Sequence, residues 1–390
     1  MRRYREAIVL AGGFGTRLAH VVPDVCKPMA PVAGRPFLRF VMDQLAAAGV
    51  ERAVVADGYR REQIEDHFKN FYRGMDVVYS PEEKPLFTGG AVKQALAKCE
   101  GDWVFVMNGD TWLDVDFDAI EAVADNAPDS VKAVIAMKRM HDFDRYGTVD
   151  VDVNGAITAF HEKRSCAEGL INAGTYLIRK DALAGMPQKF SLESDWFEAV
   201  VSDGALLACE CAGGFIDIGV PEDYELAQTI LAPLTRGWRL AMFDRDGTVN
   251  VDTGHLFEPG KLELISETVG LMARYAADSE CKVVVVTNQA GIAKGLYTEA
   301  DMRALHRHME QELEKHGARV DAWYFCPHHP DCTGSCDCRK PAPGMLLAAM
   351  RDFDAKPADC VMYGDKPSDE AAARAAGVEF RWAGEANPRG

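Results

Sequence analysis

Residues 241–250 read Ala-Met-Phe-Asp-Arg-Asp-Gly-Thr-Val-Asn and place two aspartates, Asp244 and Asp246, directly after an apolar run that is typical of a buried strand. Active sites of α/β proteins gather at the carboxyl ends of parallel strands, so this position makes the pair a candidate site. An Asp-x-Asp pair is equally compatible with an ordinary solvated turn. The other motifs of the chain decide between these two interpretations.

A glycine-rich stretch, Leu-Ala-Gly-Gly-Phe-Gly-Thr-Arg-Leu at residues 10–18, lies about 230 residues earlier and follows another apolar run. Glycines at such a position let backbone N–H groups approach a triphosphate, and Arg17 adds a bidentate positive charge. A glycine-rich loop by itself is weak evidence, since a plain tight turn has the same composition. The chain therefore carries two candidate sites for phosphorylated substrates.

The composition favours a globular protein of the cytoplasm. The chain has 390 residues, 48% hydrophobic and 26% charged, which suffices for two or three domains. A formal net charge of −17 disfavours nucleic acid or an anionic membrane as a partner. The N-terminal apolar run breaks too early for a signal peptide, and no segment reaches the length of a membrane span. Eleven cysteines without an export signal indicate reduced thiols and a metal site, not a disulfide framework.

Apolar runs alternate with amphipathic stretches in both halves, which predicts an α/β fold with two Rossmann-like domains. In the first half we expect strands at 7–11, 53–56, 77–79 and 103–107, and helices at 36–48, 61–68 and 91–98. A strand-rich pattern from 131 to 178 predicts a mixed sheet there, and a helix at 221–231 closes the domain. In the second half we expect a parallel sheet with strands at 240–243, 283–287, 323–325 and 360–363, and helices at 299–316 and 344–353. The Pro- and Gly-containing segment 232–237 separates the predicted domains 1–232 and 238–390.

Further motifs follow the glycine stretch in order. They are Lys27-Pro28, Thr88-Gly-Gly-Ala91, Asn108-Gly-Asp110, Glu162-Lys163, Asn172-Ala-Gly174 and Asp217-Ile-Gly-Val-Pro-Glu-Asp-Tyr224. Together they resemble the sugar nucleotidyltransferase family over roughly residues 5–231. Two positions depart from the family pattern: Cys26 precedes Lys27, and Phe87 stands where a glycine is common.

The resemblance implies an in-line displacement, in which a sugar 1-phosphate oxygen attacks the α-phosphorus of a nucleoside triphosphate and pyrophosphate leaves. Arg17 and Lys27 are expected to hold the phosphates, while Asp110 and Asp217 bind Mg²⁺. The other motif residues are expected to contact the nucleotide or the sugar phosphate: Gly12, Gly13, Gly15, Thr16, Thr88, Gly89, Gly90, Asn108, Glu162, Lys163, Asn172 and Gly174.

Three more segments resolve the interpretation of the aspartate pair. They are Thr287-Asn-Gln, Arg339-Lys340-Pro and Tyr363-Gly-Asp365-Lys-x-x-Asp369. With Asp244 they resemble the haloacid dehalogenase-type phosphatases over roughly residues 239–382. The resemblance implies that Asp244 attacks phosphorus, and that Asp246 protonates the leaving oxygen and then activates water.

The same resemblance assigns the neighbouring groups. Thr287 and Lys340 are expected to stabilise the phosphoryl oxygens, and Mg²⁺ is expected at Asp244, Asp246 and Asp365. Asn288, Gln289 and Arg339 are expected to contact the substrate. Asp369 is expected to lie behind the metal ligands or to cap a helix.

A cysteine cluster precedes Arg339. Cys326-Pro-His328 and Cys336-Asp-Cys338 supply three thiols and an imidazole at a spacing that suits a closed tetrahedral zinc site. Four unconnected reduced residues are the alternative, and Cys332 is a competing ligand inside the same loop. We predict a structural Zn²⁺ that fixes the loop carrying Arg339 and Lys340.

This zinc loop resembles the branch of heptose bisphosphate and histidinol phosphatases. Asp252-Thr-Gly-His255 falls where the heptose enzymes carry a specificity turn, with His255 in place of a tyrosine. The first half is most similar to the D-glycero-D-manno-heptose 1-phosphate guanylyltransferases, which favours GTP as donor.

The order in which the two reactions can occur predicts a combined function. A 1,7-bisphosphatase that spares the anomeric phosphate makes the substrate of a heptose 1-phosphate nucleotidyltransferase, whose product is an activated heptose for surface polysaccharide. One alternative is a transferase for another sugar 1-phosphate, fused to a histidinol-phosphatase-like enzyme. A non-catalytic phosphosugar sensor is a remote alternative, because the expected catalytic groups are present. The expected partners are phosphosugar and nucleoside triphosphate substrates, and the sequence leaves the oligomeric state open.

Overall fold

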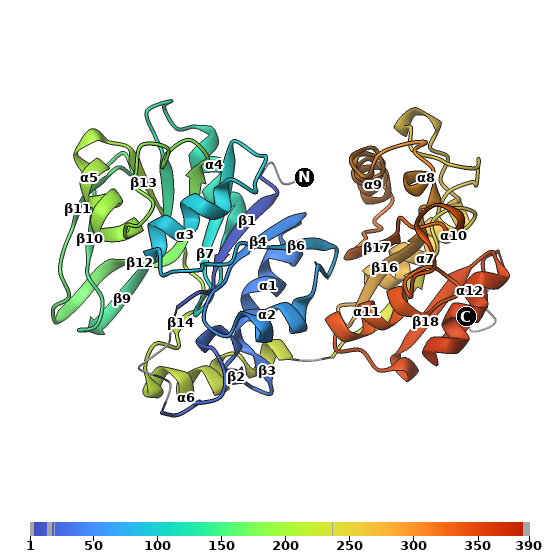
Figure 1. Cartoon of the computed structure of the whole chain (residues 1–390), viewed down its shortest axis with the longest axis horizontal. Helices are drawn as coiled ribbons and strands as arrows, with labels where there is room; N and C mark the ends of the chain where they lie inside the picture. The colour runs from blue at the N-terminus through green and yellow to red at the C-terminus, as the bar shows by residue number, and fades with distance from the viewer. Residues whose placement is uncertain (1–3, 14–17, 19, 236, 385–390) are drawn as a thin grey trace. The chain divides into compact units, whose positions relative to one another are not determined.

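The computed structural model describes residues 4–13, 18, 20–235 and 237–384. The chain divides into two compact units, Met1–Thr235 and Arg236–Gly390, and each is described here by itself (Figure 1). Both units have the α/β architecture predicted from the alternation of apolar runs and amphipathic stretches.

The first unit is built on a mixed sheet with the strand order β13-β9-β12-β7-β1-β4-β6-β5. Neighbouring strands from β7 to β6 run parallel, whereas β12 pairs antiparallel with both β7 and β9. The strands are β1 Glu6–Leu10, β4 Arg52–Ala56, β5 Phe71–Tyr72, β6 Met75–Tyr79, β7 Trp103–Asn108, β9 Ala133–Phe143, β12 Cys166–Arg179 and β13 Leu206–Glu210. Small two-stranded sheets pair β2 Pro31–Val32 with β3 Arg35–Pro36, β8 Thr111–Leu113 with β14 Phe215–Asp217, and β10 Val149–Val151 with β11 Ile157–Phe160.

Alternate residues of the central strands enter two separate cores. On β1, Ala7 and Val9 pack on one face, whereas Ile8 packs on the other. This alternation follows from the two-residue period of a strand, and helices cover both faces. The helices of this unit are α1 Phe37–Ala47, α2 Arg61–Phe68, α3 Phe87–Leu96, α4 Phe117–Asp125, α5 Glu198–Val200 and α6 Pro221–Ile230, with a 3₁₀ helix at Lys27–Met29 and a π-helix at Leu192–Phe197.

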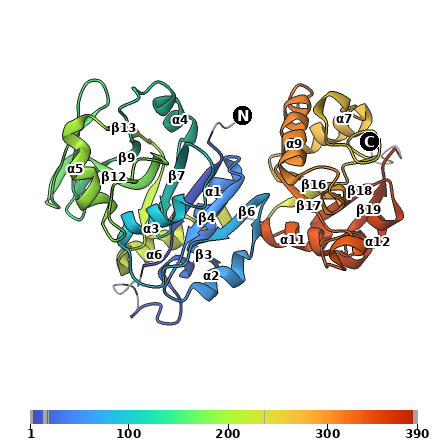
Figure 2. The same ribbon diagram turned by 45° about the horizontal axis from the view of Figure 1, so that its top comes forward.

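The second unit has a parallel sheet in the order β17-β16-β15-β18-β19, as predicted. Its strands are β15 Arg239–Phe243, β16 Cys281–Asn288, β17 Ala322–Cys326, β18 Cys360–Gly364 and β19 Glu379–Trp382. Helices α7 Ser266–Ala276 and α9 Glu299–Glu314 pack on one face, and α11 Gly344–Asp352 and α12 Pro367–Ala376 lie on the other (Figure 2). Short helices α8 Ala290–Ala293 and α10 Pro330–Thr333 follow β16 and β17. Within the described residues, no helix combines the length and the apolar character required to cross a bilayer.

Helix α3 differs from its prediction, because it begins at Phe87 and ends at Leu96 instead of spanning 91–98. The N–H of Leu86 donates to the Glu82 carboxylate at 2.9 Å, which satisfies one donor at the helix start. Thr88-Gly-Gly, expected as a turn before the helix, therefore lies inside its first turn. Phe87 has φ +61°, a conformation that favours glycine, the residue the family pattern places here.

Two candidate active sites

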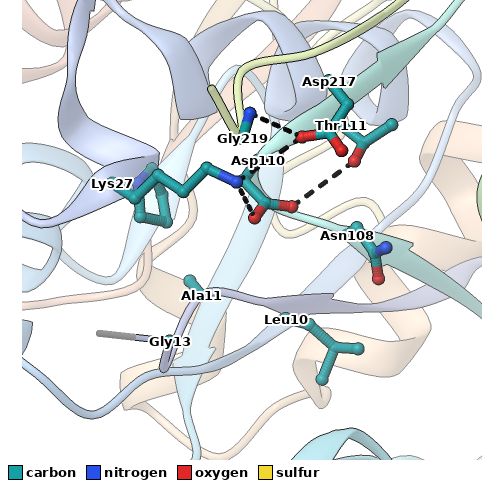
Figure 3. A pocket seen from close by; sticks show the side chains of 10 residues that line it. Leu10, Ala11, Gly13, Lys27, Asn108, Asp110, Thr111, Asp217 and Gly219 are labelled. Atoms are coloured by element: carbon teal, nitrogen blue, oxygen red, sulfur yellow. Dashed lines mark hydrogen bonds and ion pairs between the residues drawn. The ribbon is translucent and has the colours of Figure 1, made fainter. Parts of the chain in front are cut away.

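The first site is a cavity of about 410 Å³ at the carboxyl ends of β1 and β7. It is lined by Leu10, Ala11, Gly13, Lys27, Pro28, Asn108, Asp110, Thr111, Asp217 and Gly219 (Figure 3). Antiparallel pairing of β8 with β14 sets Thr111 opposite Asp217, and this register brings Asp217 beside Asp110. Residues more than 100 positions apart thus share one pocket.

Lys27 points between the two acidic side chains. Its Nζ lies 2.5 Å from Asp110 Oδ2 and 3.5 Å from Asp217 Oδ1. Burial opposes the charged form of the lysine, but the two carboxylates outweigh burial and raise the pKa of Lys27. Burial raises the pKa of Asp217, and the nearby Asp110 adds to that effect. Two carboxylates for one ammonium group leave net negative charge, which suits a divalent cation.

Asn108 and the 172–174 turn meet at the edge of this cavity. The N–H of Gly174 donates to Asn172 Oδ1 at 3.0 Å, and the register of β12 shifts between Asn172 and Tyr176. A Cβ on Gly174 would lie 2.6 Å from Asn108 Nδ2, so the turn can pack against Asn108 because it carries glycine. Asn172 Nδ2 donates to the Tyr176 hydroxyl at 3.1 Å.

Other residues expected in this site lie away from the cavity lining. The Thr88 hydroxyl donates to Glu193 and accepts from the N–H of Leu192, so it joins α3 to the π-helix. A side-chain carbon on Gly89 would collide with the Phe190 ring, and one on Gly90 with the Gln188 carbonyl. Packing therefore accounts for these two glycines, whereas we expected nucleotide contacts.

Glu162 and Lys163 are exposed on the connection between β11 and β12 and do not line the cavity. The predicted phosphate contacts Gly15, Thr16 and Arg17 lie outside the described residues. The part of the first site that the structure describes is therefore its Lys27, Asp110 and Asp217 side.

The second site lies where β15, β16 and β18 end. Lys340 Nζ is 2.6 Å from Asp244 Oδ1 and 2.7 Å from Asp369 Oδ1, and it donates to the Val286 carbonyl at 2.8 Å. Lys340 and Asp369 are almost completely buried. Asn288 holds the Lys340 backbone through two hydrogen bonds of 3.0 and 3.1 Å. The end of β16 thus fixes the lysine beside the proposed nucleophile.

A carboxylate cluster lies on the same side. Side-chain oxygens of Asp244, Asp365 and Asp369 lie within 4.8 Å of one another. Burial raises the pKa of Asp365 to about 6, and its Oδ1 is buried without a hydrogen-bond partner among the described residues. Asp369 also accepts from the N–H of Lys366 at 3.1 Å, which confirms the expected helix cap.

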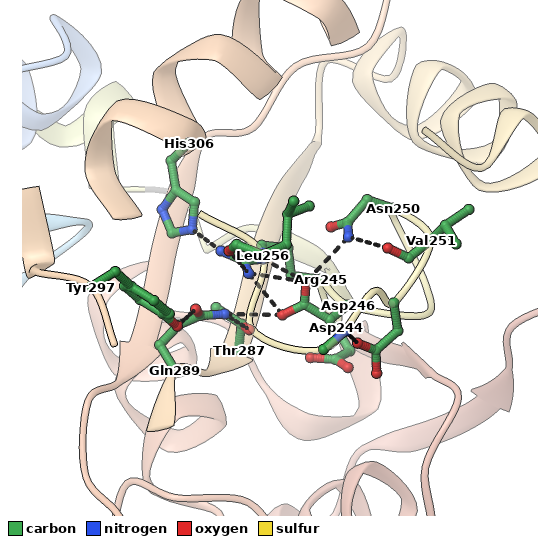
Figure 4. A network of polar contacts seen from close by, with 12 residues as sticks. Asp244, Arg245, Asp246, Asn250, Val251, Leu256, Thr287, Gln289, Tyr297 and His306 are labelled. Atoms are coloured by element: carbon green, nitrogen blue, oxygen red, sulfur yellow. Dashed lines mark hydrogen bonds and ion pairs between the residues drawn. The ribbon is translucent and has the colours of Figure 1, made fainter. Parts of the chain in front are cut away.

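The Asp246 carboxylate differs from the prediction, which had placed it among the metal ligands. It faces Arg245, Gln289 and Asn250, with Arg245 Nη2 at 3.0 and 2.9 Å from its two oxygens (Figure 4). The reason is geometric, because Asp246 lies in the loop beyond β15 and its side chain turns toward the fully buried Arg245. Gln289 Nε2 also donates to the Thr287 hydroxyl at 2.8 Å.

Sequence reasoning missed Arg245 and the residues that hold it. Arg245 Nη1 is 3.2 Å from His306 Nε2, and the His306 ring stacks on Trp323 at 3.9 Å. Burial, reinforced by Arg245, holds the pKa of His306 well below its usual value, so the imidazole is neutral. The sequence did contain one indication of this network: Arg245 lies between the two aspartates at a strand end. A charge that is buried there needs a partner.

Three of the four predicted zinc ligands come together. The Sγ atoms of Cys326, Cys336 and Cys338 are separated by 3.2 to 3.6 Å. No His328 ring nitrogen of the described loop lies within 4.8 Å of all three thiols. The His328 carbonyl instead accepts from Arg339 Nη1 at 3.1 Å. Cys332 is exposed and outside the thiol cluster.

The predicted specificity turn is exposed. Asp252 Oδ2 pairs with Lys366 Nζ at 2.9 Å, and Lys366 also reaches the Asp246 carbonyl at 3.4 Å. His255 lies on the same exposed loop. Asp252 is thereby linked through Lys366 to the loop that carries Asp246, whereas no described contact joins His255 to that loop.

Comparisons with known proteins match the two units to two different families. Residues 6–232 match the nucleotidyl transferase family, and residues 337–382 match the HAD-hydrolase-like family. D-glycero-alpha-D-manno-heptose 1-phosphate guanylyltransferase of Campylobacter jejuni is 40% identical over 221 residues, which cover 56% of this chain and 96% of the relative. D-glycero-beta-D-manno-heptose-1,7-bisphosphate 7-phosphatase of Yersinia pestis is 39% identical over 150 residues, 37% of this chain and 79% of the relative.

A solved structure supports the fold of the first unit. The crystal structure of HddC from Yersinia pseudotuberculosis is 34% identical and covers 58% of this chain and 99% of its own, with a TM-score of 0.52. Both resemblances inferred from the motifs are thus confirmed. The chain belongs to the nucleotidyl transferase family and joins to that domain a haloacid dehalogenase-type phosphatase domain.

Proposed function

We propose that this protein carries out two consecutive steps of heptose activation. The second domain removes the 7-phosphate of heptose 1,7-bisphosphate, and the first transfers GMP from GTP to the remaining 1-phosphate. The observation that carries the proposal is the pairing of the relatives: one acts on a heptose 1,7-bisphosphate, the other on a heptose 1-phosphate. The named phosphatase leaves a heptose 1-phosphate, which is the kind of substrate that the named transferase uses. Only the anomers in the two names differ.

In the transferase domain the work is positioning and charge neutralisation. A phosphate oxygen of the sugar attacks the α-phosphorus, the bond to the bridging oxygen breaks, and pyrophosphate leaves with that electron pair. Lys27 neutralises the phosphates, with Arg17 proposed for the same role. Asp110 and Asp217 would hold Mg²⁺, which supplies charge stabilisation when bound. The attacking phosphate is already ionised, so no general base is required.

In the phosphatase domain Asp244 is the proposed nucleophile. Its carboxylate attacks the 7-phosphorus while Asp246 donates a proton to the departing sugar oxygen. Asp246 then takes a proton from the water that hydrolyses the aspartyl-phosphate. Arg245 and Gln289 hold the Asp246 carboxylate in place. Lys340, whose Nζ lies beside Asp244, and Thr287 would stabilise the phosphoryl oxygens. Asp244 and Asp365 would hold Mg²⁺, which the unpartnered buried oxygen of Asp365 suits.

We also propose a structural zinc ion at the thiol cluster. A tetrahedral Zn²⁺ with 2.3 Å bonds to sulfur separates its thiolates by about 3.8 Å, close to the separations of Cys326, Cys336 and Cys338. A turn of the His328 ring would complete the set. The ion would fix the loop that positions Lys340, and metal analysis of the purified protein and of Cys336→Ser tests this directly.

The chemistry of the two steps requires that they share one anomer of the sugar. Neither reaction breaks the bond between C1 and its oxygen, so both domains must accept the same anomer. The names of the relatives differ here, with alpha for the transferase and beta for the phosphatase. Because the transferase makes the final product, we assign the α anomer to the pathway, and the phosphatase domain then accepts the α-1,7-bisphosphate.

A direct assay tests the proposal. The protein and Mg²⁺ are incubated with α- or β-heptose 1,7-bisphosphate and each of GTP, ATP, CTP and UTP, and products are identified by mass spectrometry. We expect GDP-heptose from the α anomer with GTP. No nucleotide-heptose with any donor would refute the proposal, whereas product from the β anomer would refute the anomer assignment.

A further inference from the structure

His306 is a buried histidine of the phosphatase domain that takes no part in the proposed reaction steps. It belongs to α9, where it is 4% exposed, and its ring stacks on Trp323 at a centroid distance of 3.9 Å. Its Nε2 atom faces the guanidinium group of Arg245 at 3.2 Å (Figure 4). A helix that supplies no proposed catalytic group thus reaches the arginine between the two catalytic aspartates.

This contact determines the protonation of the imidazole. A guanidinium group has five N–H donors and no acceptor, so the contact requires the lone pair of His306 Nε2. Burial, reinforced by the positive charge of Arg245, holds the pKa of His306 well below its usual value, which agrees with a neutral ring whose proton is on Nδ1. His306 is therefore a hydrogen-bond acceptor for a buried cation.

Arg245 donates from all three of its side-chain nitrogens. Nε and Nη2 donate to the Asp246 carboxylate at 2.9 to 3.1 Å. Nη2 also donates to the Leu256 carbonyl at 3.0 Å, which holds the end of the predicted specificity loop. In the described part of the chain, Nη1 has one acceptor, His306. Because Arg245 is fully buried, loss of this acceptor would leave an N–H group without a partner.

The orientation of the guanidinium group matters for proton transfer. When Asp246 gives its proton to the departing oxygen, a negative charge forms on its carboxylate. Arg245 can stabilise that charge through two nitrogens. Such stabilisation accelerates the reaction most when the donors already point at the group on which charge develops. A guanidinium group that turns toward another acceptor loses this arrangement.

We propose that His306 is a positioning residue for the phosphatase reaction: by accepting a hydrogen bond from Arg245, it holds the guanidinium group in the orientation that supports proton transfer by Asp246. This inference rests on the proposed role of Asp246 as general acid and adds a residue that acts on it from α9. Removal of the acceptor should therefore weaken protonation of the leaving oxygen more than any other part of the reaction.

The test uses two probes that differ in how much their leaving oxygen needs a proton. Phenyl phosphate must release a strongly basic phenolate, whereas the nitrophenolate of 4-nitrophenyl phosphate leaves without a proton. With the full-length protein in excess over the probe and Mg²⁺ present, the rate of phenol or nitrophenol release reports the first chemical step alone. Asp246→Asn is the reference and should slow phenyl phosphate about 10²- to 10⁴-fold, and 4-nitrophenyl phosphate much less.

Two variants of similar size separate the acceptor from the packing. His306→Leu removes the acceptor and should slow phenyl phosphate by at least about 10-fold, but 4-nitrophenyl phosphate by less than about 3-fold. His306→Gln supplies an amide oxygen in place of Nε2 and should keep both rates within about 3-fold of wild type. His308→Leu is the matched control, because this partly exposed histidine lies on the same helix, and it should leave both rates unchanged.

Equal losses for the two probes in His306→Leu would indicate a general structural effect and overturn the assignment. A His306→Gln variant as slow on phenyl phosphate as His306→Leu would also overturn it. Equal losses in Asp246→Asn would refute the proposed general acid itself, so the two failures are distinguishable. Neither probe contains a heptose, and the result is therefore independent of the proposed sugar substrate.

Discussion

The two sites use the same elements, a lysine held between two carboxylates, at different depths. In the transferase site the side chain of Lys27 is 13% exposed, and those of Asp110 and Asp217 are 34% and 31% exposed. In the phosphatase site Lys340, Asp244 and Asp369 are 2%, 7% and 1% exposed. The phosphatase site is therefore assembled by the core of its sheet, whereas the transferase site stays open to a large nucleotide.

This difference has an energetic consequence. If a buried lysine loses its carboxylate partners, or if buried carboxylates lose their lysine, the remaining charge is not solvated by water. Partly exposed charges are solvated and lose much less. Substitutions in the phosphatase site should therefore affect folding as well as chemistry, and those in the transferase site mainly chemistry.

The largest expected effect separates the two activities. Asp244→Asn removes the proposed nucleophile and should lower phosphate release from heptose 1,7-bisphosphate by at least about 10⁴-fold. Pyrophosphate release from heptose 1-phosphate and GTP should be unchanged, since Asp244 belongs to the other unit. Asp110→Asn should show the reverse pattern, with a loss of about 10²- to 10³-fold in pyrophosphate release. Loss of both activities in either variant would contradict independent sites.

The next largest effect is on the free energy of unfolding, and it tests whether the more deeply buried lysine contributes more to stability. Lys340→Met leaves Asp244 and Asp369 without their cation and should destabilise the protein by about 3–5 kcal/mol. Lys27→Met should cost no more than about 1 kcal/mol, because its partners are one-third exposed. Urea unfolding of the full chain, followed by circular dichroism in chelator, compares the two midpoints. Equal shifts would mean that burial does not distinguish the sites.

A third prediction concerns Asp57, at the end of β4. Asp57 is fully buried, and neither carboxylate oxygen has a hydrogen-bond partner in the described structure. Burial, with Glu65 adding, raises its pKa from 3.8 to about 6. The stability contributed by protonated Asp57 is therefore complete below about pH 3.8 and is lost as pH rises through about 6.

The wild-type protein should lose up to about 3 kcal/mol across this interval from this group. Asp57→Asn should remove the loss, so the variant should gain about 2 kcal/mol more stability relative to wild type at pH 7.5 than at pH 4.5. Thermal unfolding at both pH values measures this, with exposed Asp66→Asn as control. A variant that gains no more at pH 7.5 than at pH 4.5 would show that Asp57 is ionised without cost.

The smallest effect concerns Phe87. A left-handed backbone at a non-glycine residue costs about 1 kcal/mol, so Phe87→Gly should raise the unfolding free energy by up to that amount. Phe87→Ala keeps the Cβ and should give no such gain, although it also removes the contact of Lys189 Nζ, 4.5 Å from the ring centroid. If the glycine and alanine variants had equal unfolding free energies, any gain would come from removing the phenyl ring and not from relieving the left-handed backbone.

Much of the fold was predictable because the buried strands are short apolar runs that end in polar motifs. Lys27, Asp110 and Asp217 could be assigned together because their motifs occur in the order typical of the sugar nucleotidyltransferases. Arg245 could not be assigned, since its importance depends on which neighbours the folded chain supplies. The helical position of Thr88-Gly-Gly also escaped prediction, because a loop 100 residues away packs on those glycines. Motifs mark strand ends, whereas packing decides which neighbouring side chains the site uses.

The measurement that tests the central claim most directly is the stoichiometry of products from α-heptose 1,7-bisphosphate and GTP with the wild-type protein. The account predicts one phosphate and one pyrophosphate for each GDP-heptose formed. It also predicts that Asp244→Asn makes GDP-heptose only when heptose 1-phosphate is supplied. Phosphate release without GDP-heptose, or GDP-heptose formation from the bisphosphate by Asp244→Asn, would contradict consecutive action of the two sites.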